Sequence, residues 1–243
     1  MKKYLYQDLF ELEEVHWWHI AKRKICLALI KKYVKTRSNF KVLDIGCGTG
    51  KNLEEFCKFG KAFGIDTSID AIRFCREKRG LKNVTLASAQ KTGFSYDSFD
   101  VVCILDVLEH TDDKKTLKEI HRILKPGGLL LITVPAFNFL WSRWDEVLHH
   151  RRRYTKDSLE KILSFTNFEV VKISYMYSFL VVPLIVIRFI KSFLFKNHYP
   201  SDFKISNKIL NKVMISVSAL ESNLIFNGSI PFGTSLVCVA KKS

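Results

Sequence analysis

The stretch that most constrains this fold is an apolar run that ends in alternate glycines, Val42 to Gly50. The run from Phe40 to Ile45 has the length of a buried strand, and apolar residues recur at helical spacing after it. Glycines between a strand and a helix allow a sharp turn, and they leave room for a ligand because they carry no Cβ. The start of the helix adds free N–H groups. The pattern therefore predicts a strand, a glycine turn and a helix, with a ligand at the turn.

The spacing of the glycines separates two kinds of nucleotide-like ligand. A dinucleotide fingerprint has the form G-x-G-x-x-G, and its third glycine would fall where this chain has Lys51. Here Gly46, Gly48 and Gly50 alternate, and Asp44 stands two residues before the first of them. This arrangement resembles motif I of the class I S-adenosylmethionine (SAM) methyltransferases. A glycine-rich turn that holds no ligand is the alternative interpretation.

Further matches to this family lie at the ends of later strands. A short apolar strand at 62–66 ends in Asp66, and an acid at that place can accept hydrogen bonds from both ribose hydroxyls. A very apolar strand at 98–105 begins with F-D-x-V and leads into Leu-Glu-His at 108–110, as in the branch that includes quinone-biosynthesis methyltransferases. A Lys-Pro-Gly-Gly turn at 125–128 then enters another apolar strand. The resemblance implies that SAM is the cofactor.

The loop after the expected strand at 84–87 departs from the family. Many relatives have G-D-A-E-x-x-P-F there, and the acid bonds the adenine amino group. This chain has Ser88 in place of the acid and Gln90 in place of the Glu, so the backbone N–H of Ala89 and a Ser or Gln side chain are left to hold adenine. The resemblance implies that the following residues contact the cofactor: Asp44, Gly46, Cys47, Gly48, Gly50, Asp66, Thr67, Ser88, Ala89, Gln90, Leu105 and Asp106.

The order of the expected elements predicts the fold class. Strands and helices alternate with short connections, which is typical of a doubly wound parallel sheet with its ligand beyond the carboxyl ends of the strands. We expect one α/β domain over residues 1–243, built on a Rossmann-like seven-stranded sheet. Its expected parts are N-terminal helices at 1–38, the core sheet at 39–175 and 233–243, and a helical insertion before the last strand at 176–232.

The N-terminal helices are expected to cap the cofactor site. Apolar residues recur at helical spacing from Leu5 to Val15, and a second amphipathic run at 20–34 carries a basic face that includes Lys22, which we expect in solvent. Class I methyltransferases commonly carry such helices over the SAM site. Trp17 and Trp18 are therefore candidates for the wall of the acceptor pocket. Packing of the two tryptophans against the sheet is the alternative.

The loop at 135–154 is aromatic first and then basic. It resembles a pattern, W-S-x-x-D followed by H-x-R-R-Y, of a set of bacterial class I methyltransferases. Arginines beside the cofactor would suit a phosphate, pyrophosphate or carboxylate on the acceptor. The candidate acceptor-binding residues are Trp17, Trp18, Trp141, Arg151, Arg152, Arg153 and Tyr154. The alternative is that the arginines pair with nearby acids, namely Asp145, Glu146 and Asp157.

Methyl transfer from SAM is one in-line displacement, for which the enzyme supplies alignment and excludes water. An acceptor hydroxyl needs a base, and histidine suits that role near neutral pH. His110, at the end of the strand at 98–105, is the first candidate, followed by His149 and His150. A carboxylate or phosphate acceptor needs no base. No cysteines and histidines stand at metal-site spacing, so we expect no metal.

Composition bears on partners and location. The net charge of +15 suits nucleic acid, an anionic membrane surface or a phosphorylated substrate. Six cysteines without a C-x-x-C pair, and an N-terminus without an apolar signal core, predict a cytoplasmic protein. The apolar run at 175–187 is short for a membrane span. The run and its following lysines can rest on the inner face of a membrane, cover the acceptor pocket or form a homodimer surface.

Together these features predict an enzyme, a SAM-dependent methyltransferase. The expected reaction is O-methylation of a small acceptor that is anionic or linked to a lipid or glycan. A nucleic-acid methyltransferase is one alternative, but no base-flipping N/D-P-P-Y/F tetrad follows the strand, where Leu-Asp-Val-Leu stands at 105–108. A SAM-binding or scaffold protein without catalysis is the other alternative.

Overall fold

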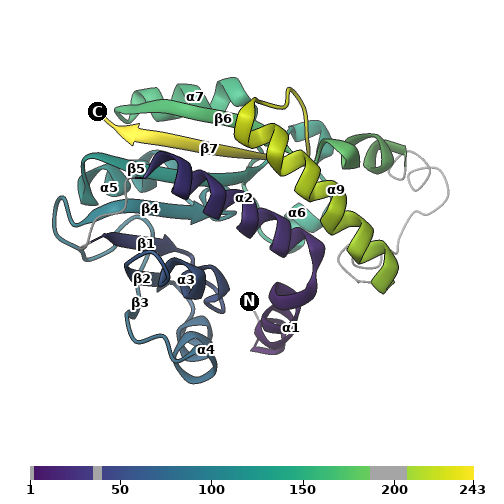
Figure 1. Ribbon diagram of the computed structural model, residues 1–243. Coiled ribbons are helices and arrows are strands. Elements are labelled where there is room, and N and C mark those ends of the chain that lie inside the picture. Colours follow the sequence, from purple (N-terminus) through teal and green to yellow (C-terminus); the bar gives the residue numbers. More distant parts are fainter. Residues whose placement is uncertain (1–2, 35–39, 187–206) are drawn as a thin grey trace.

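Seven strands form one sheet in the order β3-β2-β1-β4-β5-β7-β6. The computed structural model describes residues 3–34, 40–186 and 207–243 (Figure 1). The strands are β1 (Lys41–Ile45), β2 (Lys61–Asp66), β3 (Val84–Leu86), β4 (Phe99–Leu105), β5 (Leu124–Pro135), β6 (Phe168–Met176) and β7 (Ser235–Lys242). The predicted α/β, seven-stranded Rossmann-like fold is confirmed.

Helices lie on both faces of this sheet. They are α1 (Lys3–Val15), α2 (Trp17–Tyr33), α3 (Lys51–Phe56), α4 (Ile69–Arg79), α5 (Asp113–Ile123), α6 (Arg143–Val147), α7 (Lys156–Phe165) and α9 (Lys208–Asn227), with short 3-10 turns at Leu108–His110, Asn138–Leu140 and Ser178–Leu180. Helices α5 and α7 pack on one face, and α2, α3, α4 and α9 pack on the other. In Figure 1 α2 and α9 run side by side across that second face.

The central strand β4 shows why the sequence there is apolar throughout. Val102 and Ile104 point into the core under α5 and α7, whereas Val101 and Cys103 point into the core under α2 and α3. Because alternate residues of a strand face opposite sides, a strand covered on both faces must be apolar at every position. The neighbouring β1 follows the same rule, with Leu43 on one side and Val42 on the other.

The sheet is mixed, whereas the sequence predicted a parallel one. Strand β7 runs antiparallel to both of its neighbours, β5 and β6, and β1 to β5 pair in parallel. The Lys-Pro-Gly-Gly segment, expected as a turn, lies within β5, where Gly127 takes a φ of +73° and the register with β4 shifts. Strand β6 continues to Met176, one residue beyond the core-sheet segment that was expected to end at 175, so the expected insertion starts slightly later.

Most of the insertion that the structure describes is helical. A 3-10 turn at Ser178–Leu180 leads into a helical stretch at 181–186, and α9 follows after residue 206. The amphipathic piece expected at 189–195 lies outside the described residues. Helix α9 is the one described helix whose length and composition would suit a membrane span, with a mean hydropathy of 1.3, and 17% of that window is buried.

Candidate active site

A cavity of about 460 Å³ lies beyond the carboxyl ends of β1, β2 and β4. This volume falls in the range of small-molecule and cofactor sites. The segments that line it come from α1, the glycine turn, the ends of β2 and β3, and the start of the 3-10 turn after β4. The lining residues are Tyr6, Leu9, Ile45, Gly46, Gly48, Asp66, Thr67, Ala87, Ser88, Ala89, Gln90, Asp106, Val107, His110 and Thr111.

The glycine turn forms the floor of this cavity. The N–H groups of Gly46 and Cys47 both donate to the carbonyl of Ile65, at 2.8 and 3.0 Å, and so fix the turn against β2. Gly46 has a φ of +72°, and a Cβ there would lie 2.3 Å from a methyl of Val107. Gly48 has a φ of +55°, but its Cβ would meet nothing closer than 3.8 Å. The space above Gly48 is therefore open for a ligand.

Asp66 faces the same turn. One oxygen of its carboxylate accepts the N–H of Gly48 at 3.0 Å, and the other accepts the N–H of Ser68 at 2.9 Å. The side chain is thereby held at the tip of β2, on the cavity wall. Asp44 lies behind the turn, almost fully buried, and one of its oxygens has no hydrogen-bond partner among the described residues. Burial, with Glu13 and Asp66 nearby, raises the pKa of Asp44 to about 8.

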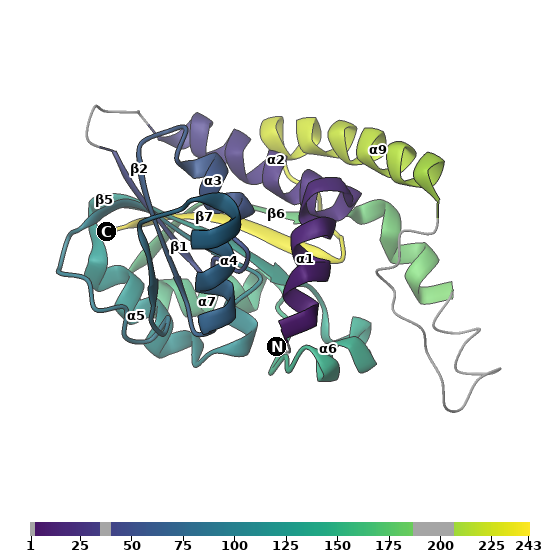
Figure 2. The ribbon, with the colours of Figure 1, turned by 90° about the horizontal axis from the view of Figure 1, so that it is seen from below.

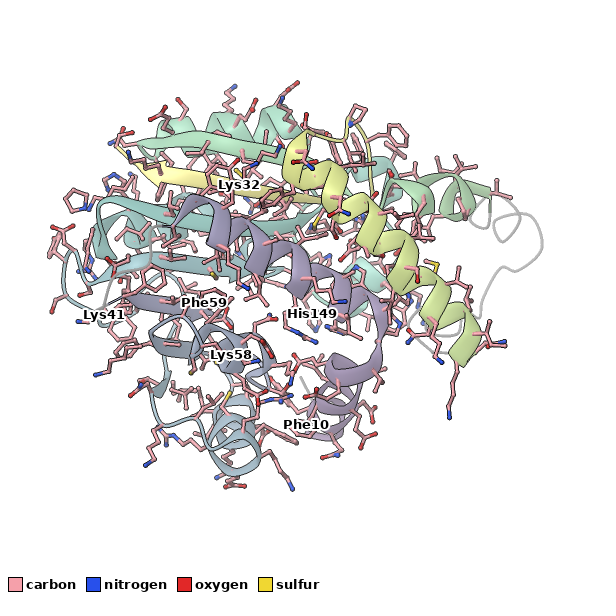
Figure 3. The ribbon with its side chains drawn as sticks, viewed as in Figure 1. Phe10, Lys32, Lys41, Lys58, Phe59 and His149 are labelled. Carbon is pink, nitrogen blue, oxygen red and sulfur yellow. The ribbon has the colours of Figure 1, made fainter. Side chains whose placement is uncertain are left out.

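Helix α1 covers the cavity from the N-terminal side. Its Tyr6 and Leu9 line the cavity, and Phe10, labelled in Figure 3, packs against Phe74 of α4 with ring centroids 5.9 Å apart. Figure 2 shows α1 beside α4. Glu13 is buried, accepts the hydroxyl of Thr49 next to Gly48, and lies 3.5 Å from Arg79. Burial raises the pKa of Glu13 above its usual range.

Helix α2 reaches the site through Lys22. Its ammonium group lies 2.5 Å from one oxygen of Asp106, whose other oxygen accepts the hydroxyl of Thr133 at 2.9 Å. Lys22 is 7% exposed, so its expected place in solvent is wrong. The ammonium also lies 3.9 Å from the ring centre of Trp18. The ion pair between Lys22 and Asp106 connects α2 to the end of β4, where Asp106 has a φ of +54°.

The two predicted tryptophans pack beside this ion pair. The rings of Trp17 and Trp18 lie 5.5 and 6.3 Å from that of Tyr177, which is fully buried. Neither tryptophan lines the cavity. Their position fits the alternative of packing against the sheet, and a contact with the acceptor stays a prediction.

The loop after β3 supplies the opposite wall through Ser88, Ala89 and Gln90, as the resemblance implied. Its far end is fastened to α5, because the N–H and hydroxyl of Thr92 both donate to Glu119, at 2.9 and 2.7 Å. Burial opposes ionisation of Glu119, but the hydrogen bonds from Arg122 and Thr92 lower its pKa to about 2. The loop is therefore anchored by a charged side chain.

Histidine side chains gather at the end of the cavity beside β4. His110 lines the cavity, and its ring centre lies 4.8 Å from that of His150. Burial and the neighbouring His150 lower the pKa of His110 below its usual value. His149, labelled in Figure 3, is exposed and does not line the cavity, although its carbonyl lies 3.4 Å from Nδ1 of His110.

Two of the three arginines at 151–153 form ion pairs with acidic residues of the same chain. Arg153 contacts Asp145 at 2.7 and 3.1 Å, and Arg152 contacts Asp113 at 2.5 Å. The hydroxyl of the buried Tyr154 also donates to Asp113, at 3.2 Å. These contacts support the alternative interpretation for Arg152, Arg153 and Tyr154, with Asp113 as a partner that the sequence did not reveal. Arg151 and Trp141 are exposed.

The predicted cofactor residues therefore divide into two groups. Eight line the cavity: Gly46, Gly48, Asp66, Thr67, Ser88, Ala89, Gln90 and Asp106. His110, predicted as a base, lines it as well. Asp44, Cys47, Gly50 and Leu105 stand behind that surface and do not line it. Tyr6, Leu9 and Lys22 were missed. In the sequence these three residues were marked only by the apolar repeat of the N-terminal helices. Such a repeat predicts a helix but not which part of the site its side chains contact.

Comparisons with known proteins agree with this geometry. Residues 43–132 match the family model described as a methyltransferase domain. The ubiquinone biosynthesis O-methyltransferase of Pelagibacter ubique is 32% identical over 108 residues, which are 42% of this chain and 45% of that protein. The demethylmenaquinone methyltransferase of Geobacillus stearothermophilus is 34% identical over 110 residues, which are 41% of this chain and 47% of that protein.

A solved structure extends the likeness to the whole fold. The SAM-dependent methyltransferase of Archaeoglobus fulgidus has a TM-score of 0.59 at 20% identity, and covers 96% of this chain and 99% of its own. At that identity the likeness concerns the fold alone. The fold, the glycine turn and the sequence matches are those of the class I SAM-dependent methyltransferases, and residues 43–132 match the model of their methyltransferase domain. The chain spans less than half the length of the two curated relatives.

The residues present fit SAM. The open space at Gly48 admits a ligand against the backbone, and Asp66 stands where ribose hydroxyls need an acceptor. The unpartnered oxygen of buried Asp44 suits the positive charge that SAM carries on its ammonium and sulfonium groups.

Proposed function

We propose that this chain transfers the methyl group of SAM to an oxygen of a small acceptor that is anionic or linked to a lipid or glycan. The observation that carries the proposal is one cavity with the glycine turn and Asp66 on one side and His110 on another. A cofactor held at the turn therefore has an ionisable side chain within the same enclosed space.

The chain's residues divide the work of holding the cofactor. Asp66 accepts hydrogen bonds from the ribose hydroxyls, and the Ala89 N–H with Ser88 or Gln90 holds the adenine edge. The glycine turn receives the methionine part, with Asp44 buried behind the turn. Tyr6 and Leu9 of α1 cover the site and exclude water, which strengthens the electrostatic contacts inside. The bound cofactor supplies an electrophilic methyl group on its sulfonium.

The acceptor end contains His110, which we assign as the side chain closest to the acceptor oxygen. Its lowered pKa keeps the ring neutral at pH 7, so a ring nitrogen can accept a proton from a hydroxyl. Two curated relatives that act in quinone biosynthesis support a small acceptor with oxygen groups. The net charge of +15 and the exposed Arg151 favour an anionic acceptor.

The reaction is tested by transfer of a labelled methyl group from SAM into cell-extract fractions that contain lipids, nucleotide sugars or nucleic acids. We expect label in the lipid or sugar fraction, and loss of most of it with the Asp66→Ala variant. Label in the nucleic-acid fraction alone would instead support the alternative that the net charge of +15 suggests. Binding of SAM without transfer to any fraction would support a scaffold or SAM-sensing protein.

We also propose a cytoplasmic location with peripheral contact to the inner face of a membrane. The support is the high net positive charge together with exposed apolar residues on α9, among them Ile209, Leu220 and Leu224. An apolar surface with nearby lysines can lie in the interface of an anionic membrane. A lipid-linked acceptor would then reach the cavity without leaving the membrane.

A further inference from the structure

Glu109 is a buried acid that the proposed cofactor site does not use. Its side chain is fully buried, and neither carboxylate oxygen has a hydrogen-bond partner among the described residues. Burial, with Asp106 nearby, raises its pKa well above the usual value. A buried carboxylate without partners is costly, and buried charges are normally paired or bound to a metal. Among the described residues the Glu109 carboxyl therefore has no hydrogen-bond donor, although Lys22 and Arg153 lie near enough to favour its charged form.

His150 presents an acceptor nitrogen toward Glu109. Its Nδ1 lies 2.8 Å from Asp145, and contacts with His150 and Arg153 hold the pKa of Asp145 well below its usual range although burial opposes this. An ionised Asp145 can only accept, so Nδ1 carries the hydrogen and Nε2 of the neutral ring has a free lone pair. That Nε2 lies 4.0 Å from Oε1 of Glu109. Metal-binding histidines are commonly oriented by such a carboxylate on the other nitrogen.

His110 completes the group. One donor atom from each of Glu109, His110 and His150 lies within 4.8 Å of the other two. Ligands of Zn²⁺ stand about 2.0–2.2 Å from the ion in a tetrahedral arrangement, so two of them are about 3.4 Å apart, and the more distant donor atoms of the group must draw together by about 1 Å. Two imidazoles and one carboxylate suit Zn²⁺ and other divalent first-row transition metals.

We propose that Glu109, His110 and His150 form a site for a divalent transition-metal ion, with Zn²⁺ as the first candidate. The sequence led us to expect no metal, because no cysteines and histidines stand at metal-site spacing. The ligands meet only when the loop after β5 folds back onto the 3-10 turn at Leu108–His110. The N–H of Arg151 donates to the carbonyl of Glu109 at 3.0 Å and holds these two segments together.

The surrounding charges leave room for a cation. Lys22 is paired with Asp106, Arg153 with Asp145 and Arg152 with Asp113. Each of these three basic groups has its own carboxylate, whereas Glu109 has no hydrogen-bond partner among the described residues. An ion would displace the proton of Glu109, and each histidine would bind the ion through a lone pair that protons compete for.

The ion would lie next to the methyl-donor site, because His110 lines the cavity. Three protein ligands leave positions for acceptor oxygens, as in catalytic metal sites. This role rests on the proposed function. A bound ion would lower the pKa of an acceptor hydroxyl, and the proton would pass to solvent. The acceptor oxygen would form the new bond to the methyl carbon, and the carbon–sulfur bond would break with its electron pair on sulfur. With the ion bound, His110 would act as a ligand in place of the base role proposed above.

Ion binding is tested on the full chain after dialysis against a chelator. Zn²⁺ is titrated by calorimetry, and Co²⁺ is followed by its visible absorption. We expect one ion per chain in the wild type, no specific binding in Glu109→Gln and His150→Ala, and at least about tenfold weaker binding in Asp145→Asn, which orients His150. The control is His121→Gln, since His121 lies on α5 outside the group, and it should bind like the wild type.

Thermal unfolding of each variant shows whether it is folded, and a variant that fails this check is replaced by His110→Ala. A wild type that binds Zn²⁺ and Co²⁺ no better than Glu109→Gln overturns the metal site. SAM is titrated into the same samples, and Glu109→Gln should bind it within about threefold of the wild type. Ion binding without SAM binding would refute the proposed function and leave the metal site standing.

Discussion

Asp44 is the residue whose ionisation most clearly links the site to stability. Its pKa is about 8 in the folded protein, against 3.8 for an ordinary aspartate. Between these values the folded state binds more protons than the unfolded state, so the free energy of unfolding falls as pH rises. Below pH 4 both states are protonated, and above pH 8 both are ionised, so the effect is confined to that window.

We therefore expect Asp44→Asn to remove a pH dependence. From pH 5 to 8 the wild type should lose up to about 1.4 kcal/mol of stability per pH unit through this group, and the variant should lack that part of the slope. Urea unfolding at four pH values on both proteins measures it. Equal slopes for the two proteins would show that Asp44 is ionised throughout.

The residues of the cofactor turn could be predicted because their roles are local. Glycines at alternate positions and an acid at a strand end follow from the backbone geometry of one segment. Lys22 could not be predicted, because its partner Asp106 is 84 residues away and a helical repeat does not reveal an ion pair across the fold. The acid partners of Arg152 and Arg153 also depend on how the loop folds. The sequence therefore left open whether these arginines bind the acceptor or pair with acids of the chain.

At the scale of elements, the loop after β3 depends on α5 for its position. Glu119 accepts two hydrogen bonds from Thr92 and pairs with Arg122 at 2.7 Å. These contacts connect the helix to the loop whose Ser88, Ala89 and Gln90 line the cavity. The loop therefore keeps its shape only while this carboxylate is ionised.

Glu119→Ala should weaken both stability and cofactor binding. Hydrogen bonds to charged groups contribute about 1.5–3 kcal/mol, so we expect a loss of about 2 kcal/mol in unfolding free energy and a several-fold weaker affinity for SAM. Urea unfolding and calorimetry measure the two effects. Glu160→Ala is the control, because Glu160 only meets Lys156 at 3.9 Å on the surface of α7. The prediction fails if both variants behave alike.

Element boundaries followed from capping and periodicity where these signals were strong. Helix α7 spans 156–165, and Thr155 before it, a residue type that commonly caps helices, accepts the N–H of Ser158 and marks its start. The antiparallel direction of β7 could not be read from a continuous apolar strand, since both faces are buried in either direction. The Lys-Pro-Gly-Gly segment reads as a turn locally, yet pairing with β4 extends β5 through it.

At the scale of the whole molecule, the net positive charge and the exposed apolar residues would both favour binding to an anionic membrane surface. Helix α9 exposes Ile209, Leu220 and Leu224 on one element and carries exposed lysines at 208 and 212. The sequence predicted the lid or membrane contact at the apolar run 175–187 and the lysines after it. The part of that stretch beyond residue 186 lies outside the described residues, and the exposed apolar surface that the structure describes is on α9.

The protein should float with anionic liposomes and detach as salt is raised, because basic groups near the surface are screened by ions. A Leu220→Glu, Leu224→Glu double variant should bind several-fold less. Phe165→Glu is the control, since Phe165 is exposed on α7, against the opposite face of the sheet. Equal loss in both variants would mean that charge alone governs binding, and no flotation of the wild type would remove the membrane proposal.

The central claim is that SAM binds against the glycine turn, and its most direct test is calorimetric titration of two glycine variants. Gly48 and Gly80 have similar φ values, +55° and +65°, and a Cβ would clash at neither, but only Gly48 lines the cavity. We expect micromolar SAM binding to the wild type and to Gly80→Ala, and at least about tenfold weaker binding to Gly48→Ala, where the methyl occupies ligand space. Equal affinities in the two variants, or binding of NADH in place of SAM, would contradict the account.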